Sequence, residues 1–423
     1  MVQKSYERNG MPPILPENVI LAIQDFFACD SFEEEIACFI KNYNALKDCK
    51  FLIYSDAYGV EFPECFKTNY NNDFAIIEIG SSDKYYVVDE KICEDVMRNK
   101  QSNYNLDICV ELDTQVISYL KNIFKSREEI NIPDSKKNLF YYLSQSNVNY
   151  SSILYLLENA KKITKDNMEE VYMNLKSYEI FRNFDYRLYV DEGKKCFRND
   201  EANMMINIDN TFNNILSKKY HEYMKDIYDM QEHIYCLLLK AILIEHEYSK
   251  KSADNKMKML VEYVNNNLGV FCEREMTICY HYFNHHENTE KFFKKTKSNS
   301  KNILNTVNGM AWDLTHIRLM ERLYKFTFDG YVKFGIHPIL TYDNGLKDVL
   351  KLCSVRKIAI YDGNLFPCFK SSFVEIFPES INLIHNSEVT EKRRIVFMNR
   401  NMELIKNELE REMENGLDIK NMN

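Results

Sequence analysis

The sequence predicts an α/β protein in which a long run of helices separates two parts of one core. Two observations support this fold class. Near both ends of the chain, short segments rich in strand-forming residues lead into segments with helical spacing, whereas the middle has apolar residues at three- and four-residue intervals. A chain of 423 residues is also too long for one minimal domain, so we expect several structural units.

Residues 1–104 are the first predicted unit, a mixed α/β segment. A helix is expected from about Pro16 to Tyr43, and turn-rich stretches separate the strands that follow it. The predicted strands are Lys50–Tyr54, Phe74–Ile79 and Tyr85–Val88. No catalytic motif falls in this unit, so we expect it to extend a neighbouring sheet or to bind a partner.

Residues 105–163 and 303–385 are predicted to form one core, although a long segment separates them. The strand Asp107–Leu112 runs into a helix, and Ser151–Ala160 is an apolar helical run. The second half contains an amphipathic helix over Ala311–Arg318 and a strand that ends at Thr341 before another helix. Further strands are expected at Lys357–Tyr361 and Ser372–Phe377.

The segment 164–302 is predicted to be a helical insertion, and residues 386–423 a charged C-terminal helix. The insertion has helical periodicity over Met168–Arg182, Asn210–Glu247 and Lys256–Val270, and its aromatic stripe is typical of a packed core. The apolar stripe of the tail helix suits packing on the body, or pairing with another chain as a homo-oligomer.

Composition favours a cytoplasmic protein with no membrane partner. Residues 1–16 lack the apolar centre of a secretory signal, and the longest apolar run, Ile234–Ile244, is too short to span a bilayer. The 12 cysteines are scattered without a Cys-x-x-Cys spacing, which is typical of free thiols. His281 and His285 have i, i+4 spacing, but no second segment supplies the further ligands that zinc needs.

Four acids stand out by their positions. Asp113 and Asp343 each follow a strand where a helix begins, Glu158 is the only charge in its apolar run, and Asp313 is flanked by apolar residues. Plainer interpretations exist for three of them. Asp113 and Asp343 have the residue type that caps helices, and Glu158 has lysines at i+3 and i+4. His316 shares a helix face with Asp313 and could touch substrate, but it is rather expected to be a surface or core-edge histidine.

In this order, Asp113-Thr114-Gln115, Glu158, Asp313 and Thr341-Tyr342-Asp343 resemble the motifs of the PIN-domain (PilT N-terminus) nuclease family. Gln115 stands where asparagine is more usual, and the stretch between Glu158 and Asp313 is far longer than in compact members. The resemblance covers about a third of the chain. It implies a PIN-like three-layer core with a central, mostly parallel sheet, here interrupted by the helical insertion.

The resemblance also implies a metal-dependent ribonuclease. Clustered carboxylates repel one another unless a cation neutralises them, so Asp113, Glu158, Asp313 and Asp343 would bind Mg²⁺ or Mn²⁺. The hydroxyl of Thr341 would position water or the neighbouring carboxylate, and the cut would leave a 3′-hydroxyl. A stress or phage-defence toxin with a protein inhibitor or a trigger would fit this architecture.

Charge bears on the RNA partner in two ways. A net charge of −9 disfavours generic nucleic-acid binding and suits a narrow substrate class such as tRNA. A basic stretch over residues 291–301 could guide RNA to the acids, or it could be a solvated linker. The candidate RNA-binding residues in this stretch are Lys294, Lys295, Lys297 and Lys301. Two alternatives to a nuclease are an inactive PIN-like scaffold and a helical interaction protein in which the acids are only caps. The last alternative predicts that the four carboxyl groups scatter.

Overall fold

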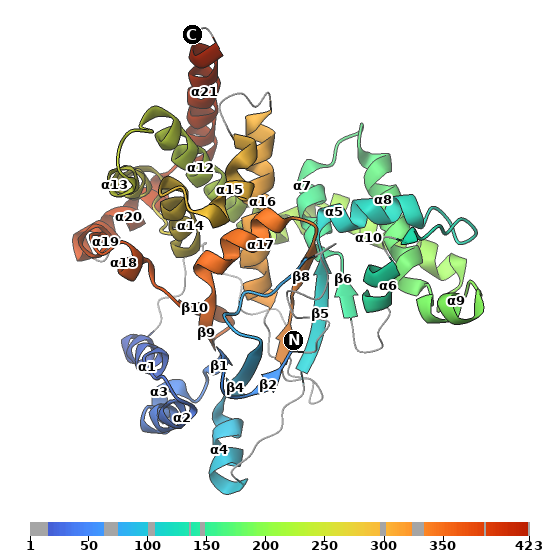
Figure 1. The fold of residues 1–423 in the computed structure, drawn as a ribbon, viewed down its shortest axis with the longest axis horizontal. Helices are drawn as coiled ribbons and strands as arrows, with labels where there is room; N and C mark the ends of the chain where they lie inside the picture. The colour runs from blue at the N-terminus through green and yellow to red at the C-terminus, as the bar shows by residue number, and fades with distance from the viewer. Residues whose placement is uncertain are drawn as a thin grey trace.

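Two sheets and many helices make up the protein (Figure 1). The computed structural model describes residues 16–62, 75–99, 106–134, 137–143, 149–296, 302–323, 334–384 and 386–421. The chain is a mixed α/β protein, as predicted, with two sheets. Among the helices of these residues, none is long and apolar enough to cross a membrane.

The β5 sheet is the mostly parallel sheet that positions the acids. Its strands are β3 (Ala75–Ile77), β5 (Leu106–Leu112), β6 (Asn149–Ser151), β7 (Phe334–Ile336) and β8 (Ile339–Thr341). The order is β3-β8-β5-β6, and β7 also pairs with β5. β6, β7 and β8 run parallel to β5, and β3 is antiparallel to β8. Because β5 and β8 are parallel, the residues after each strand meet at one edge of the sheet.

The β1 sheet is antiparallel and combines strands from both ends of the chain. Its order is β10-β9-β1-β4-β2, with β1 at Lys50–Tyr54, β2 at Val60–Glu61, β4 at Lys84–Val88, β9 at Val355–Tyr361 and β10 at Asn364–Phe369. The strand predicted at Lys357–Tyr361 therefore exists, but it pairs with β1 in a second sheet. The strand predicted at Ser372–Phe377 is wrong. This segment forms α18 (Phe373–Ile376), because Ser372 and Glu375 make a capping box.

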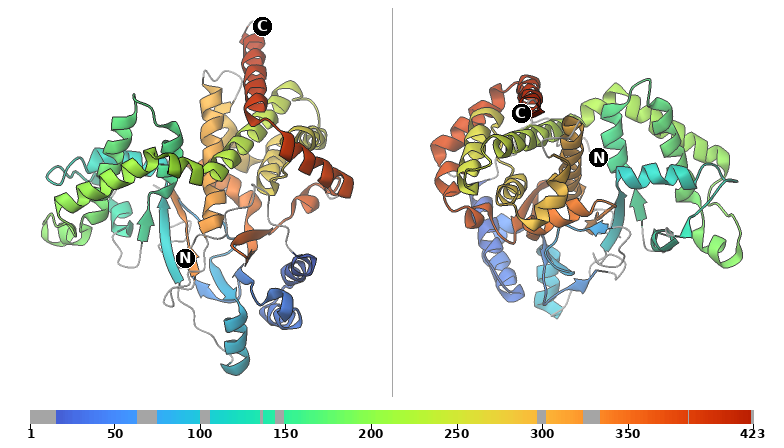
Figure 2. Two further views of the ribbon diagram at one scale, coloured as in Figure 1. Left: turned by 180° about the vertical axis from the view of Figure 1, so that it is seen from behind. Right: turned by 45° about the horizontal axis from the view of Figure 1, so that its top comes forward.

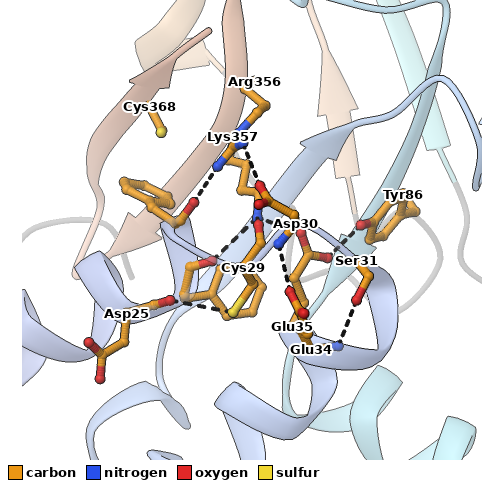
Figure 3. A network of polar contacts seen from close by, with 12 residues as sticks. Asp25, Cys29, Asp30, Ser31, Glu34, Glu35, Tyr86, Arg356, Lys357 and Cys368 are labelled. Carbon is orange, nitrogen blue, oxygen red and sulfur yellow. Dashed lines mark hydrogen bonds and ion pairs between the residues drawn. The ribbon is translucent and has the colours of Figure 1, made fainter. Parts of the chain in front are cut away.

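Three short helices replace the single helix predicted from Pro16 to Tyr43. α1 (Glu17–Phe27), α2 (Phe32–Lys41) and α3 (Tyr43–Leu46) cover one face of the β1 sheet. A buried ion pair holds α2 to β9, with Lys357 Nζ 2.6 Å from Glu35 Oε1 (Figure 3). Tyr86 on β4 donates a hydrogen bond to the same carboxylate. Burial raises the pKa of Glu35, and the positive charge of Lys357 opposes that rise.

The helices form two groups on either side of the β5 sheet (Figure 1). α8 packs on α5 in one group, while α12 packs on α16 and α21 in the other. Seen from behind in Figure 2, α10 and α12 carry the chain from one group to the other. The first group has α5 (Thr114–Ile123), α6 (Lys137–Leu143), α7 (Ile153–Lys162), α8 (Met168–Asn183), α9 (Tyr186–Glu192), α10 (Glu201–Leu216) and α11 (Lys218–Tyr223).

The second group contains the rest of the predicted insertion and the C-terminal helices. It has α12 (Lys225–Glu247), α13 (Ala253–Tyr263), α14 (Glu273–Phe283), α15 (Glu287–Phe293), α16 (Ile303–Leu323), α17 (Asn344–Leu350), α19 (Ser380–Ile384), α20 (Ser387–Asn399) and α21 (Met402–Asn421). The predicted single tail helix is thus two helices, which meet at Arg400. His285 lies beyond the end of α14 with a φ of 53°, so it does not share a helix face with His281. α4 (Glu90–Asn99) follows β4.

Candidate metal centre

Asp113 lies where β5 ends and α5 begins. Its backbone N–H donates to the Leu340 carbonyl of β8 at 3.1 Å, and this hydrogen bond holds the end of β5 against β8. Its Oδ1 accepts a hydrogen bond from the backbone N–H of Thr114 at 2.6 Å, so Asp113 is indeed a helix N-cap. Its Oδ2 accepts one from the hydroxyl of Thr341 at 2.7 Å. Capping therefore uses only one oxygen, and the other faces β8.

Thr341 joins the two aspartates that follow parallel strands. Its hydroxyl is fully buried, donates to Asp113 and accepts from the backbone N–H of Asp343 at 3.0 Å. Asp343 Oδ1 in turn accepts from the N–H groups of Gly345 and Leu346, at 2.6 and 3.1 Å. Asp343 is therefore the N-cap of α17. The predicted positioning role of Thr341 has a geometric basis in these contacts.

α16 brings Asp313 and His316 to the same place. Each of Asp113, Asp313 and His316 offers one ligand atom, and these atoms all lie within 4.8 Å of one another. His316 is 2% exposed, so it lies inside the site rather than at a surface or core edge as expected. Within the described part of the chain, its Nε2 atom is buried and has no hydrogen-bond partner. Burial lowers the pKa of His316, so the imidazole is neutral at pH 7 and can act as a ligand.

Glu158 reaches the site through Thr114. Its Oε2 accepts a hydrogen bond from the Thr114 hydroxyl at 2.6 Å, and its Oε1 lies 2.6 Å from Lys162 Nζ. The pairing with a lysine one helical turn away is thus present, but with Lys162 alone, because Lys161 pairs with Glu232. Burial raises the pKa of Glu158, yet His316 and Lys162 outweigh burial, and the pKa lies below its usual value.

Of the four carboxyl groups, those of Asp113 and Asp313 each offer an oxygen to the same cluster. Burial raises the pKa of Asp313 well above its usual value, and the charges of Asp113, Asp343 and Glu158 raise it further. Burial also raises the pKa of Asp113, against the opposing influence of His316 and Thr341. Burial and mutual repulsion thus disfavour the charged forms of Asp313 and Asp113 in the folded protein. A divalent cation would relieve this repulsion.

The donor atoms bear on which cation would fit. Asp113 and Asp313 offer oxygen and His316 offers nitrogen, a set that suits Mn²⁺ better than Mg²⁺, which prefers oxygen throughout. Glu158 and Asp343 lie beside this trio. The sequence indicated the pairing of Glu158 with a lysine at i+4, but not a ligand role for His316 or the hydrogen bond from Thr114. The i+3 spacing of His316 from Asp313 was the available signal for the histidine.

Basic side chains flank the helix that Asp343 caps. α15 packs closely on α17, since a Cβ atom added at Gly345 would lie 3.0 Å from the backbone nitrogen of Phe292. Lys291 Nζ also lies 2.8 Å from Asp348 Oδ2 on α17. Lys294 and Lys295 follow α15 in a 3₁₀ turn and are exposed. The other two predicted RNA-binding residues, Lys297 and Lys301, lie outside the described residues.

Comparisons with protein-family models, with curated proteins and with solved structures give no match to this chain.

Proposed function

We propose that this protein is a metal-dependent ribonuclease of PIN type, with its centre at Asp113, Asp313 and His316. One observation carries the proposal: two carboxyl groups and a buried imidazole meet within 4.8 Å, and one imidazole nitrogen has no partner among the residues that the structure describes. Leaving these groups together without a cation is costly, because like charges repel and the buried imidazole nitrogen loses its hydration. A cation would satisfy all three groups.

The donor set supports Mn²⁺ as the preferred cofactor. When bound, this cation would supply Lewis acidity and charge neutralisation for hydrolysis of a phosphodiester bond. Thr341 fixes the orientation of Asp113 by donating to Oδ2, and Thr114 fixes Glu158 in the same way. The pKa of Glu158 lies below its usual value, so the carboxylate is ionised at neutral pH and would orient an attacking water as a hydrogen-bond acceptor.

Two sets of lysines support RNA as the substrate. Lys162 pairs with Glu158 at the site and keeps 38% of its side chain exposed, so its ammonium can also contact a phosphate. Lys294 and Lys295 are exposed in the turn after α15 and can hold the backbone of the RNA further from the cut. The remaining acidic surface favours a structured RNA such as tRNA, because generic binding needs wider positive charge.

The capping hydrogen bonds favour a second candidate, a non-catalytic PIN-like scaffold that binds a protein. Asp113 and Asp343 both satisfy backbone N–H groups at helix starts, which gives each a structural role without any cation. Gln115 is exposed in the first turn of α5, where the family more often has asparagine. These features would remain if catalysis had been lost.

The test uses the full chain, total RNA and Mn²⁺. We compare the wild type with an Asp313→Asn, Asp343→Asn double variant and with Asp191→Asn, which changes an exposed acid in α9. The proposal predicts fragments with 3′-hydroxyl ends from the wild type and from Asp191→Asn, and none from the double variant or in EDTA. Equal cleavage by all three proteins would contradict it. Carboxylate-dependent Mn²⁺ binding in calorimetry without any cleavage would support the scaffold.

A further inference from the structure

A second group of ligand-type side chains lies on the β5 sheet, one step along β5 from Asp113. Cys109 and Glu111 are two residues apart on β5, so they project from the same face. His337 follows β7, which pairs in parallel with β5 through Ile108 and Ile336. One sulfur, one carboxylate oxygen and one imidazole nitrogen from these three residues lie within 4.8 Å of one another.

Glu111 is the buried member of this group. It is 1% exposed, and its backbone N–H donates to the Pro338 carbonyl at 2.8 Å. Its Oε1 lies 2.9 Å from His337 Nδ1, whereas its Oε2 is buried and lacks a hydrogen-bond partner among the residues that the structure describes. A buried carboxylate oxygen without a partner is costly. The unpartnered oxygen of Glu111 is therefore available to a positive ligand.

We propose that Cys109, Glu111 and His337 bind a single divalent cation of the zinc class. Thiolate and imidazole ligands select Zn²⁺ or Co²⁺ over Mg²⁺ and Ca²⁺, and a carboxylate commonly completes such a set. Tetrahedral zinc, with ligands at about 2.0–2.3 Å, brings ligand atoms to about 3.5 Å from one another, so small side-chain rotations suffice. Binding forms the metal–sulfur bond to the Cys109 thiolate and releases the thiol proton to solvent.

The fourth coordination position would face solvent. The side chain of His337 is 20% exposed while that of Glu111 is 2% exposed, so the cation would enter from the histidine side. Three protein ligands and one open position are the arrangement of zinc sites that exchange a ligand, whereas purely structural sites use four protein ligands. The cation could therefore take a water or a small anion there.

The position also suggests what the cation does for the fold. The cation would link the β7–β8 turn, which contains His337, to β5. β8 then leads directly to Thr341 and Asp343, and β5 leads to Asp113. The zinc-class site would thus hold both strand ends that position the carboxylates. Its existence does not depend on the proposed ribonuclease activity, because its ligands are different residues.

Co²⁺ titration into the full chain, stripped with a chelator, tests the proposal. Cobalt bound to a thiolate gives a near-ultraviolet charge-transfer band together with visible ligand-field bands. We expect the charge-transfer band to saturate at one Co²⁺ per chain and to disappear when Zn²⁺ is added. Cys109→Ser should abolish it. His337→Ala should weaken Co²⁺ binding by about 100-fold or more, since the loss of an outer partner alone costs about 10–100-fold.

Two matched controls separate this site from others. Cys196→Ser changes a half-buried cysteine near α9, and Asp313→Asn changes the carboxylate centre; both should keep the band. No charge-transfer band in the wild type, or a band that survives Cys109→Ser, would overturn the proposal. If Cys109→Ser fails to fold, His337→Ala decides, because it lies at a partly exposed position in a turn. Co²⁺ binding of unchanged affinity in that variant would likewise overturn it.

Discussion

Replacing Asp313 by asparagine should stabilise the metal-free protein, although Asp313 is proposed as a metal ligand. Burial and three neighbouring carboxylates raise the pKa of Asp313 well above the ordinary value of 3.8. The folded state therefore holds this proton more tightly than the unfolded state does. As pH rises above about 3.8 toward the folded-state pKa, the wild type loses stability by about 1.4 kcal/mol per pH unit. Asparagine carries no charge and escapes this loss.

The assay is urea denaturation followed by circular dichroism, in EDTA, at pH values from 5 to 8. The free energy of unfolding of Asp313→Asn should exceed that of the wild type by a margin that grows with pH until Asp313 is ionised in the folded protein. Asp191→Asn, in an exposed part of α9, serves as the matched control and should follow the wild type. An Asp313→Asn variant that is less stable than the wild type at every pH would refute the reasoning.

Mn²⁺ should reverse the order of stability of the wild type and the Asp313→Asn variant. A cation at 100 times its dissociation constant stabilises the folded state by about 2.7 kcal/mol, and only the wild type retains both carboxylate ligands. The wild type should therefore be the more stable protein in saturating Mn²⁺ and the less stable one in EDTA. Binding should also release a proton, so Mn²⁺ affinity should rise with pH. Equal stabilisation of both proteins by Mn²⁺ would mean that Asp313 is not a ligand.

Four further predictions follow from particular contacts. Thr341→Val removes the hydroxyl shared by Asp113 and the Asp343 backbone, and should lower the free energy of unfolding by about 1–3 kcal/mol in urea titrations. His316→Gln replaces the nitrogen ligand by oxygen, so calorimetry should show Mn²⁺ losing its advantage over Mg²⁺. Burial lowers the pKa of His233 to about 3 from 6.5. The free energy of unfolding of the wild type should therefore fall by about 1.4 kcal/mol per pH unit as pH drops below 6.5, and His233→Gln should flatten that slope in acid denaturation. A Lys294→Glu, Lys295→Glu variant should bind RNA more weakly in filter binding, and the slope of log K against log salt concentration should fall by about 0.7 per lost phosphate contact. For each of these four variants, an unchanged value in its assay would contradict the role assigned to the residue.

Local sequence was enough to place the acids on their elements. The change from strand to helical spacing at Asp113 matches the junction of β5 and α5, and the end of β8 at Thr341 matches the apolar strand predicted there. Both junctions are short-range features, in which an aspartate that caps a helix directly follows a segment of strand-forming residues. The same signal could not tell a cap from a ligand. The structure shows why, since Asp113 caps α5 with one oxygen and meets Thr341 with the other.

Pairing between distant segments was beyond local reasoning. β9 follows β8 closely in sequence but pairs with β1, about 300 residues earlier. Tertiary contacts fix the register of β9 on β1, and local sequence does not reveal them. The helix at Phe373–Ile376 was readable, since Ser372 and Glu375 have the spacing of a capping box, but its aromatic and β-branched residues favoured a strand. The break at Arg400 depends on contacts with Leu268 and His233, which the tail sequence does not reveal.

Anomalous scattering from a crystal of the full chain grown with Mn²⁺ tests the central claim most directly. We expect a manganese peak between the carboxylates of Asp113 and Asp313 and the Nε2 atom of His316, with these atoms closer to one another than the present limit of 4.8 Å. The same map from an Asp313→Asn crystal should lack that peak. An ordered, metal-free trio in saturating Mn²⁺, or a peak that persists without Asp313, would contradict it.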